Sequence, residues 1–259
     1  MSTTISVIII CKNEEINISD CINSAYFANE ILVLDSGSTD NTVQLAKAAG
    51  AKVIETDWPG YGRQKNRAIE ASSSDWIFSL DADERITPAL ATEILSKINH
   101  PEFNVYEVPR KSLYISKFMR HSGWYPDKTK RLFKRGSAKF TDSLIHESVT
   151  TAENTGALSE AILHFSYRDF ESLLQKINLY SSIGAQKKFS ESKKGSSLKR
   201  AVFSGIWAFF RTYIIKAGFL DGRAGFMLAV SNAEGVYYRH LKIMLLHQQH
   251  AKENSQPRS

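Results

Sequence analysis

The chain has 259 residues, of which 42% are hydrophobic and 23% are charged. This composition is typical of one large globular domain, or of one domain with an extension. The net charge of +6 favours a polyanionic partner, such as nucleotide phosphates, anionic lipid or nucleic acid. The two cysteines, Cys11 and Cys21, are too few for a disulfide scaffold and suit buried positions in a reducing compartment. Because no signal peptide precedes the first strand-like run, we expect a cytoplasmic protein.

The first 100 residues alternate short apolar runs with helical segments. Strands are predicted at residues 5–10, 30–35, 51–55 and 75–83, and helices at 16–28, 43–49, 63–72 and 88–98. The runs are rich in β-branched residues and almost continuously apolar, as in strands that are covered on both faces. This order predicts a parallel sheet with right-handed crossovers.

Acidic residues follow two of these runs at the point where each strand ends. Asp35 closes one strand, and Asp81-Ala82-Asp83-Glu84 closes another. Ligands of open parallel sheets bind at the carboxyl ends of strands, and residues i and i+2 of an extended chain point to one side. Asp81 and Asp83 are therefore predicted to bind one divalent cation together. Alternatively, one binds the metal and the other binds a ribose hydroxyl. Taken alone, the triplet also fits an acidic turn before a helix that begins at Thr87-Pro88.

The second half of the chain has a different texture. A strand is predicted at 104–109, a hairpin from 131–134 and 138–140, an apolar run at 161–167 and a helix at 169–189. A basic linker at 190–200 precedes a strongly apolar and aromatic segment at 201–220. Because Arg211 and Lys216 interrupt this segment, it suits a helix lying in a membrane interface better than a spanning helix. A core helix packed on the sheet is the alternative.

Several motifs together resemble a family 2 glycosyltransferase with the GT-A fold: residues 7–14, 35–40 and 81–83. More narrowly, residues 9–15, 34–42, 80–84, 145–147 and 218–226 resemble the bacterial lipopolysaccharide-core β-glucosyltransferase branch, and the likeness spans residues 5–245. The resemblance implies an α/β fold, with a Rossmann-like mixed sheet flanked by helices and a C-terminal helical extension. Its expected divisions are a nucleotide-sugar-binding half (1–100), an acceptor-binding and catalytic half (101–189), a helical, membrane-associated extension (190–247) and a disordered tail (248–259).

The family implies inverting transfer of a sugar from a nucleotide-sugar to an acceptor hydroxyl, assisted by Mn²⁺ or Mg²⁺. In this branch the expected donor is UDP-glucose, and the acceptor is a heptose of a lipid-A-linked core on the cytoplasmic face of the inner membrane. By resemblance, Asp35 contacts the nucleobase, Asp81 the ribose or metal, and Asp83 the metal. The remaining donor contacts are expected from Asn13, Glu14, Ser36, Arg63 and Arg131, and His164 is a candidate third metal ligand.

The acceptor hydroxyl requires a general base on the opposite face of the sugar. Glu147, which follows His146 in the acceptor half, is the predicted base, and Asp142 is the runner-up. A surface ion pair is the simpler interpretation of Glu147, and a packed core histidine is the simpler interpretation of His164.

Three alternatives remain open at this point. Within glycosyltransferases, the donor could be ADP-heptose or UDP-galactose. A nucleotidyltransferase is disfavoured, because the turn after the first strand, Cys11 to Glu15, is acidic and lacks glycine. A non-enzymatic polyanion-binding protein is disfavoured because the basic residues are mixed with 27 acids and no nucleic-acid recognition motif is present. The sequence leaves the oligomeric state open.

Overall fold

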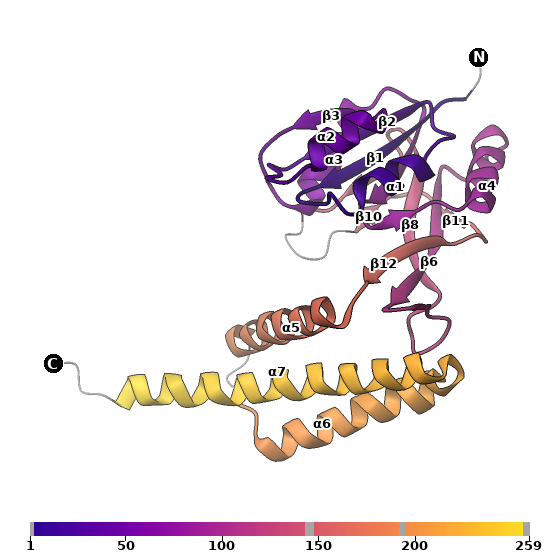
Figure 1. The fold of residues 1–259 in the computed structure, drawn as a ribbon. Coiled ribbons are helices and arrows are strands. Elements are labelled where there is room, and N and C mark those ends of the chain that lie inside the picture. The colour runs from indigo at the N-terminus through magenta and orange to yellow at the C-terminus, as the bar shows by residue number, and fades with distance from the viewer. Residues whose placement is uncertain (1–2, 143–147, 192–194, 256–259) are drawn as a thin grey trace. The chain divides into compact units, whose positions relative to one another are not determined.

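The computed structural model describes residues 3–142, 148–191 and 195–255 of the chain. It forms two compact units (Figure 1). Unit 1 comprises residues 1–111 and 126–165, and unit 2 comprises residues 112–125 and 166–259. The two units are defined by which residues pack together. The predicted division of the chain into donor-binding and acceptor-binding halves is defined by ligands instead, and it stays a prediction.

The sheet of unit 1 has a parallel part and an antiparallel part. Its strand order is β3-β2-β1-β4-β8-β6-β12-β5. Neighbours are parallel from β3 to β4, whereas β8 is antiparallel to β4 and β6. The strands are β1 (Ile5–Cys11), β2 (Glu30–Asp35), β3 (Lys52–Glu55), β4 (Trp76–Asp81), β5 (Glu84–Arg85), β6 (Val105–Tyr114), β7 (Lys117–Phe118), β8 (Asp127–Lys134), β9 (Lys139–Phe140), β10 (Val149–Thr150), β11 (Thr155–Ala157) and β12 (Ile162–Tyr167). The predicted mixed sheet is confirmed.

Helices cover both faces of the parallel strands. Val7 and Ile9 of β1 belong to the core that α1 (Ile18–Ser24), α2 (Thr42–Ala48) and α4 (Pro88–Asn99) share. Ile8 and Ile10 belong to the core on the side of α3 (Tyr61–Ala71). Alternate residues of β1 therefore enter different cores, which explains why its sequence is apolar throughout.

The predicted hairpin of residues 131–134 and 138–140 is wrong. Residues 131–134 belong to β8, which lies in the main sheet between β4 and β6. β9 pairs instead with β10, in a separate two-stranded sheet. Leu132 and Phe133 are fully buried, so the backbone of β8 is out of reach of water and needs a strand on each side to satisfy its hydrogen bonds. A short sequence separation indicated a hairpin, but burial decided the pairing.

Unit 2 is mostly helical. Its helices are α5 (Phe170–Glu191), α6 (Leu198–Phe210), the π-helix η1 (Arg211–Ile215), the 3₁₀ helix η2 (Gly218–Asp221) and α7 (Arg223–Ser255). α7 packs against both α5 and α6. It continues to Ser255, into the segment 248–259 for which the sequence predicts a disordered tail; Gln248, Gln249 and Lys252 are good helix formers. Within the described ranges, no helix is both long enough and apolar enough to cross a membrane.

The motif at residues 218–226, which spans η2 and the start of α7, packs on residues 117–121 of unit 2. The Asp221 side chain is buried, and it accepts hydrogen bonds from the backbone N–H groups of Arg120 (3.2 Å) and His121 (2.9 Å). Lys117 Nζ donates to the Asp221 carbonyl oxygen at 2.7 Å. A Cβ added to Gly225 would lie 1.8 Å from the Gly218 carbonyl oxygen. Close backbone packing therefore explains Gly225, whereas Gly222 is explained by its φ of +65°.

Gly225→Ala should lower the free energy of unfolding by about 1–3 kcal/mol, because the new methyl group collides with backbone that cannot move freely. Gly235→Ala, in the same helix, is the matched control. Its Cβ would meet only the Ile177 side chain at 3.8 Å, so the change should be neutral or stabilise the helix by up to about 1 kcal/mol. Urea unfolding of both variants tests this, and equal stabilities would contradict the packing.

Candidate active site

The carboxylates predicted at the strand ends lie at one edge of the sheet. β1 pairs with β2 so that Cys11 is opposite Asp35, and with β4 so that Ile10 is opposite Asp81. Asp35 and Asp81 therefore flank the carboxyl end of β1. This edge is where open parallel sheets bind their ligands.

Two loops at this edge are joined by side-chain hydrogen bonds. The Asn13 backbone N–H donates to Ser38 Oγ at 2.8 Å, and Asn13 Oδ1 accepts from the Thr39 N–H at 2.8 Å. The Glu14 N–H donates to Thr42 Oγ1 at 2.7 Å. Asn13 has a φ of +56°, in the left-handed region that asparagine tolerates better than most residues. The loops after β1 and β2 thus form one continuous surface that includes the predicted donor contacts Asn13 and Glu14.

Asp35 shapes the second of these loops. Its carboxylate is buried and accepts hydrogen bonds from the Gly37 N–H (2.9 Å), the Ser38 N–H (2.8 Å) and the Ser38 hydroxyl. Ser36 Oγ accepts from Gln64 Nε2 of α3 at 3.0 Å, and both residues are buried. The predicted nucleobase contact of Asp35 stays a prediction, while the structure gives the residue a role in ordering the turn. Sequence reasoning missed Gln64.

Asp81 lies between two cations that come from different elements. Lys65 Nζ of α3 is 2.8 Å from Asp81 Oδ1, and Arg131 Nη2 of β8 is 2.7 Å from Oδ2. Burial alone would raise the pKa of Asp81, but the charges of Arg131 and Lys65 outweigh it and hold that pKa well below its usual range. Asp81 is therefore ionised at neutral pH and fixed in orientation.

Arg131 also holds a second carboxylate, Glu84, which is fully buried. Glu84 Oε1 accepts from Arg131 Nη2 at 2.7 Å, and Oε2 accepts from the Asp81 backbone N–H at 3.0 Å. Burial raises the pKa of Glu84, although the charge of Arg131 opposes this shift. A buried carboxylate is tolerated only with such partners. Arg131, a predicted donor contact, thus also bridges two carboxylates of the acidic turn.

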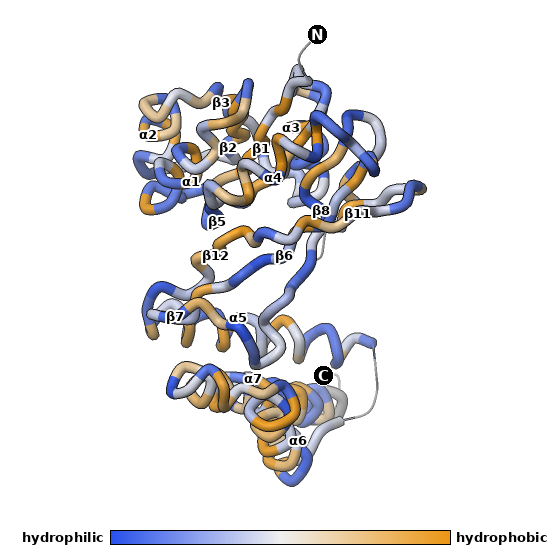
Figure 2. The backbone as a smooth tube through the Cα atoms, turned by 90° about the vertical axis from the view of Figure 1, so that its right-hand side faces the viewer, coloured by the Kyte–Doolittle hydropathy of each residue, from blue (hydrophilic) through white to orange (hydrophobic). Residues whose placement is uncertain are grey.

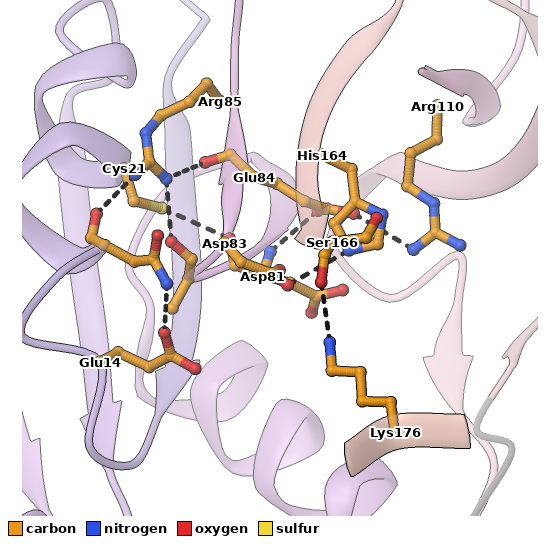
Figure 3. A network of polar contacts seen from close by, with 12 residues as sticks. Glu14, Cys21, Asp81, Asp83, Glu84, Arg85, Arg110, His164, Ser166 and Lys176 are labelled. Carbon is orange, nitrogen blue, oxygen red and sulfur yellow. Dashed lines mark hydrogen bonds and ion pairs between the residues drawn. The ribbon is translucent and has the colours of Figure 1, made fainter. Parts of the chain in front are cut away.

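Arg85 fastens the backbone of the same turn. Its Nη1 donates to the carbonyl oxygens of Ala82 (2.9 Å) and Glu84 (2.8 Å), and its Nη2 donates to the Asn17 carbonyl oxygen at 2.9 Å. The guanidinium also lies over the Phe165 ring, 5.3 Å from its centroid. Figure 3 shows Arg85 on one side of the acidic turn, and His164 and Arg110 on the other. Sequence reasoning missed Arg85 because carbonyl acceptors leave no mark in a sequence.

The structure brings Asp83 and His164 together. β12 pairs with β5, which sets His164 opposite Glu84 and places its Nε2 3.2 Å from Asp83 Oδ2. The side chains of Asp83 and His164 are 29% and 17% exposed, so solvent reaches both. This pair combines residues 81 positions apart in the sequence.

Of the three predicted metal ligands, Asp83 and His164 are placed to hold a divalent cation and Asp81 is not. Among the described residues, no three histidine, cysteine or acidic side chains converge on one point. Mg²⁺ and similar cations are often held by one or two protein ligands, with phosphate oxygens and water completing the shell. Asp83 and His164 supply two such ligands. Each oxygen of Asp81 lies within 2.8 Å of a cation, so Asp81 offers no third ligand in this arrangement.

The predicted donor contact Arg63 lies near the alternative base Asp142. Arg63 Nε is 3.9 Å from Asp142 Oδ2, and both side chains are largely exposed. They meet because Gly62 allows α3 to approach the chain at Thr141, where an added Cβ would lie 1.8 Å from the carbonyl oxygen. The Thr141 N–H in turn donates to the Ser148 carbonyl oxygen at 2.9 Å. Glu147, the predicted base, lies outside the described residues.

The mixed sheet, with carboxylates where β2 and β4 end, is the GT-A architecture that the sequence predicts. The sequence model of Glycosyl transferase family 2 matches residues 6–152, and the chain belongs to that family.

Relatives along nearly the whole chain agree with this assignment. An "Uncharacterized glycosyltransferase" of Rickettsia bellii (strain RML369-C) is 32% identical over 256 residues, which cover 94% of this chain and 87% of the relative. The "Lipopolysaccharide core biosynthesis glycosyltransferase LpsC" of Rhizobium meliloti (strain 1021) is 31% identical over 257 residues, covering 91% and 93%.

The likeness to a solved structure is shorter. Glucosyl-3-phosphoglycerate synthase from Mycobacterium tuberculosis, solved with Mn²⁺, UDP and glucosyl-3-phosphoglycerate, is 31% identical with a TM-score of 0.37. The match covers 43% of this chain and 44% of the synthase.

Arg131→Met should lower the free energy of unfolding by about 3–5 kcal/mol, because it leaves Asp81 and Glu84 without their shared partner. Lys128→Met, which removes an exposed ion pair with Glu107 on the same strand, should cost about 1 kcal/mol or less. Urea unfolding measures both. If Arg131→Met does not fold alone, the double variant with Glu84→Gln should recover stability. An Arg131→Met protein as stable as the Lys128→Met control would contradict the bridge.

Proposed function

We propose that this family 2 glycosyltransferase transfers a hexose, glucose from UDP-glucose, to a lipopolysaccharide-core heptose with inversion of configuration. The observation that carries the proposal is the solvent-reached Asp83–His164 pair at 3.2 Å, beside an Asp81 that two cations hold in place. The pair lies at the carboxyl edge of the sheet, next to the joined loops that follow β1 and β2. Donor, acceptor and stereochemistry follow from the family resemblance.

The joined loops suit the nucleoside end of the donor. Asn13, Glu14 and Ser36 lie on a surface that the contacts of Asp35 and Gln64 order before any ligand binds. A surface of this kind loses little conformational entropy when it binds. In this proposal it receives the base and ribose, and the acidic turn follows at the diphosphate.

Asp83 and His164 would hold the divalent cation at the diphosphate. When bound, the metal supplies charge neutralisation for the leaving nucleoside diphosphate. Lys65 and Arg131 contribute positive charge beside the same turn, while Asp81 keeps both oriented. Arg63, which is exposed on α3, is available for the phosphates in place of its 3.9 Å pairing with Asp142. The chain thus stabilises the leaving group mainly by preorganised charge.

Glu147 is the proposed general base, and Asp142 is the alternative. The base accepts the proton of the acceptor hydroxyl while that oxygen attacks the sugar from the face opposite to the diphosphate. Support comes from the flanking residues: Thr141 and Ser148 are bonded to each other, and Thr141 abuts α3 at Gly62, one residue from Arg63. Asp142, the alternative base, lies beside Arg63 of α3.

The acceptor proposal rests on the relative named for lipopolysaccharide core biosynthesis, which matches more than nine-tenths of this chain. An acceptor of this kind is anchored in lipid, so the enzyme would work on the cytoplasmic face of the inner membrane. ADP-heptose and UDP-galactose are the competing donors.

Asp83→Asn should lower the rate of UDP release from UDP-glucose by about a hundredfold or more, because one of two protein ligands for the cation loses its charge. EDTA should abolish the activity of the natural protein. Asp57→Asn, an exposed carboxylate paired with Arg67, is the control and should retain full activity. An Asp83→Asn enzyme that is fully active in EDTA would refute the metal assignment.

Glu147→Gln should lower turnover by about 10²–10⁴-fold, the usual contribution of a general base, with donor affinity unchanged. Steady-state kinetics and calorimetric titration with UDP separate the two effects. Asp142→Asn is the matched comparison and should change turnover much less. A loss of donor binding in Glu147→Gln would contradict its role as the base. A larger loss of turnover in Asp142→Asn would assign the base to Asp142.

A further inference from the structure

Helix α6 of unit 2 exposes its large apolar residues and buries its small ones. The buried positions are Ala201 and Gly205. The opposite side carries Val202, Phe203, Ile206, Trp207 and Phe210, which are 42–71% exposed and which we call the apolar ridge. Their spacing of three and four residues places them along one side of the helix. In water, an amphipathic helix normally arranges its residues the other way.

Small residues allow α6 to approach α7 closely. A Cβ added to Gly205 would lie 3.3 Å from the Ala233 carbonyl oxygen and 3.4 Å from Tyr237 Cβ. Helices in lipid pack in this way, through small residues with large apolar side chains turned outward, because the surrounding solvent is itself apolar. The arrangement of α6 and α7 therefore suits a helix pair with lipid against one side.

The exposed apolar surface continues past the end of α6. Ile214 and Ile215 of η1, and Phe219 and Leu220 of η2, are each about half exposed. Figure 2 shows hydrophobic colour concentrated along α6. The surface therefore spans consecutive elements of the chain, and its extent exceeds the isolated apolar residues found on ordinary protein surfaces.

The exposed charges within α6 and in the segments next to it are positive, and Asp221 at the end of η2 is buried. Residues 192–220 contain six lysines and arginines and no aspartate or glutamate. Lys199 and Arg200 begin α6, and Arg211 and Lys216 follow it; all four are exposed. Each cation near an anionic membrane contributes about 1 kcal/mol of attraction. A symmetric contact with a second copy of the chain would instead set these cations against one another without an acid from the same segment to neutralise them.

We propose that the apolar ridge, together with η1 and η2, inserts into the boundary between headgroups and acyl chains of an anionic phospholipid bilayer. α6 lies in the plane of the membrane, its aromatic side chains enter the interface, and the flanking cations contact lipid phosphates. The contact needs neither donor nor acceptor sugar, so it is independent of the proposed transfer reaction.

The test is sedimentation of the full-length protein with vesicles that contain phosphatidylglycerol. The natural protein should pellet with these vesicles, should pellet less with pure phosphatidylcholine, and should be released by high salt. The double variant Phe203→Glu with Trp207→Glu should bind vesicles about tenfold or more weakly. Two aromatic side chains that would enter the membrane are replaced by negative charges, which the lipid phosphates repel. The matched control is Leu179→Glu with Tyr180→Glu, two similarly exposed apolar residues of α5, and should bind like the natural protein.

A spectroscopic readout checks the position of the ridge directly. Brominated lipids should quench the fluorescence of Trp207, and Trp207→Phe should remove that quenching while vesicle binding persists. Circular dichroism verifies that each variant is folded. The proposal is overturned if the natural protein stays in the supernatant, or if the ridge variant pellets as well as the control. It is also overturned if the natural protein binds no vesicles but forms a dimer in ultracentrifugation, and the ridge variant is a monomer.

Discussion

The ion pairs of Asp81 hold the site together. Asp81 ends β4, Lys65 comes from α3 and Arg131 from β8, so three separate elements meet at one carboxylate. Arg131 also binds the buried Glu84, which extends the contact to β5. Lys65 and Arg131 are themselves almost fully buried, so each needs the opposite charge of Asp81 beside it, and Arg131 is also the partner of the buried Glu84. The packing of β8 beside β4 is therefore also what orients the acidic turn.

Because of these ion pairs, the carboxylates of the turn have different roles. Asp81 and Glu84 are used by the fold, whereas Asp83 points to His164 and solvent reaches both side chains. Arg85 fixes the carbonyl groups of Ala82 and Glu84, the residues on either side of Asp83. A preorganised site gains rate because it does not reorganise when charge develops on the leaving group. The position of Asp83 is thus a consequence of how its neighbours are satisfied.

The sequence predicts the parts of this arrangement that depend on local pattern. Continuous apolar runs predicted β1, β2 and β4, and their acidic ends placed Asp35, Asp81 and Asp83 at one edge. Lys65 shows the limit: nothing near it in the sequence marks this lysine as buried, yet it is 3% exposed, because its partner Asp81 lies on another element. The pairing of β9 also depends on distant residues: its partner is β10 (Val149–Thr150), and the apolar run just before it, β8, pairs elsewhere. For the segment at 201–220 the sequence left a core helix open as the alternative, and the exposure of Phe203 and Trp207 counts against that alternative.

The central claim is that this acidic turn receives the diphosphate of a nucleotide-sugar together with a divalent cation. The most direct measurement is a thermal-shift titration of the natural protein with UDP and ADP, each with Mn²⁺ and with EDTA. A ligand at a hundredfold excess over its Kd stabilises the folded state by about 2.7 kcal/mol, which gives a clear shift. The account predicts a shift with UDP that requires the metal. No shift with either nucleotide, or one that EDTA leaves unchanged, would contradict it.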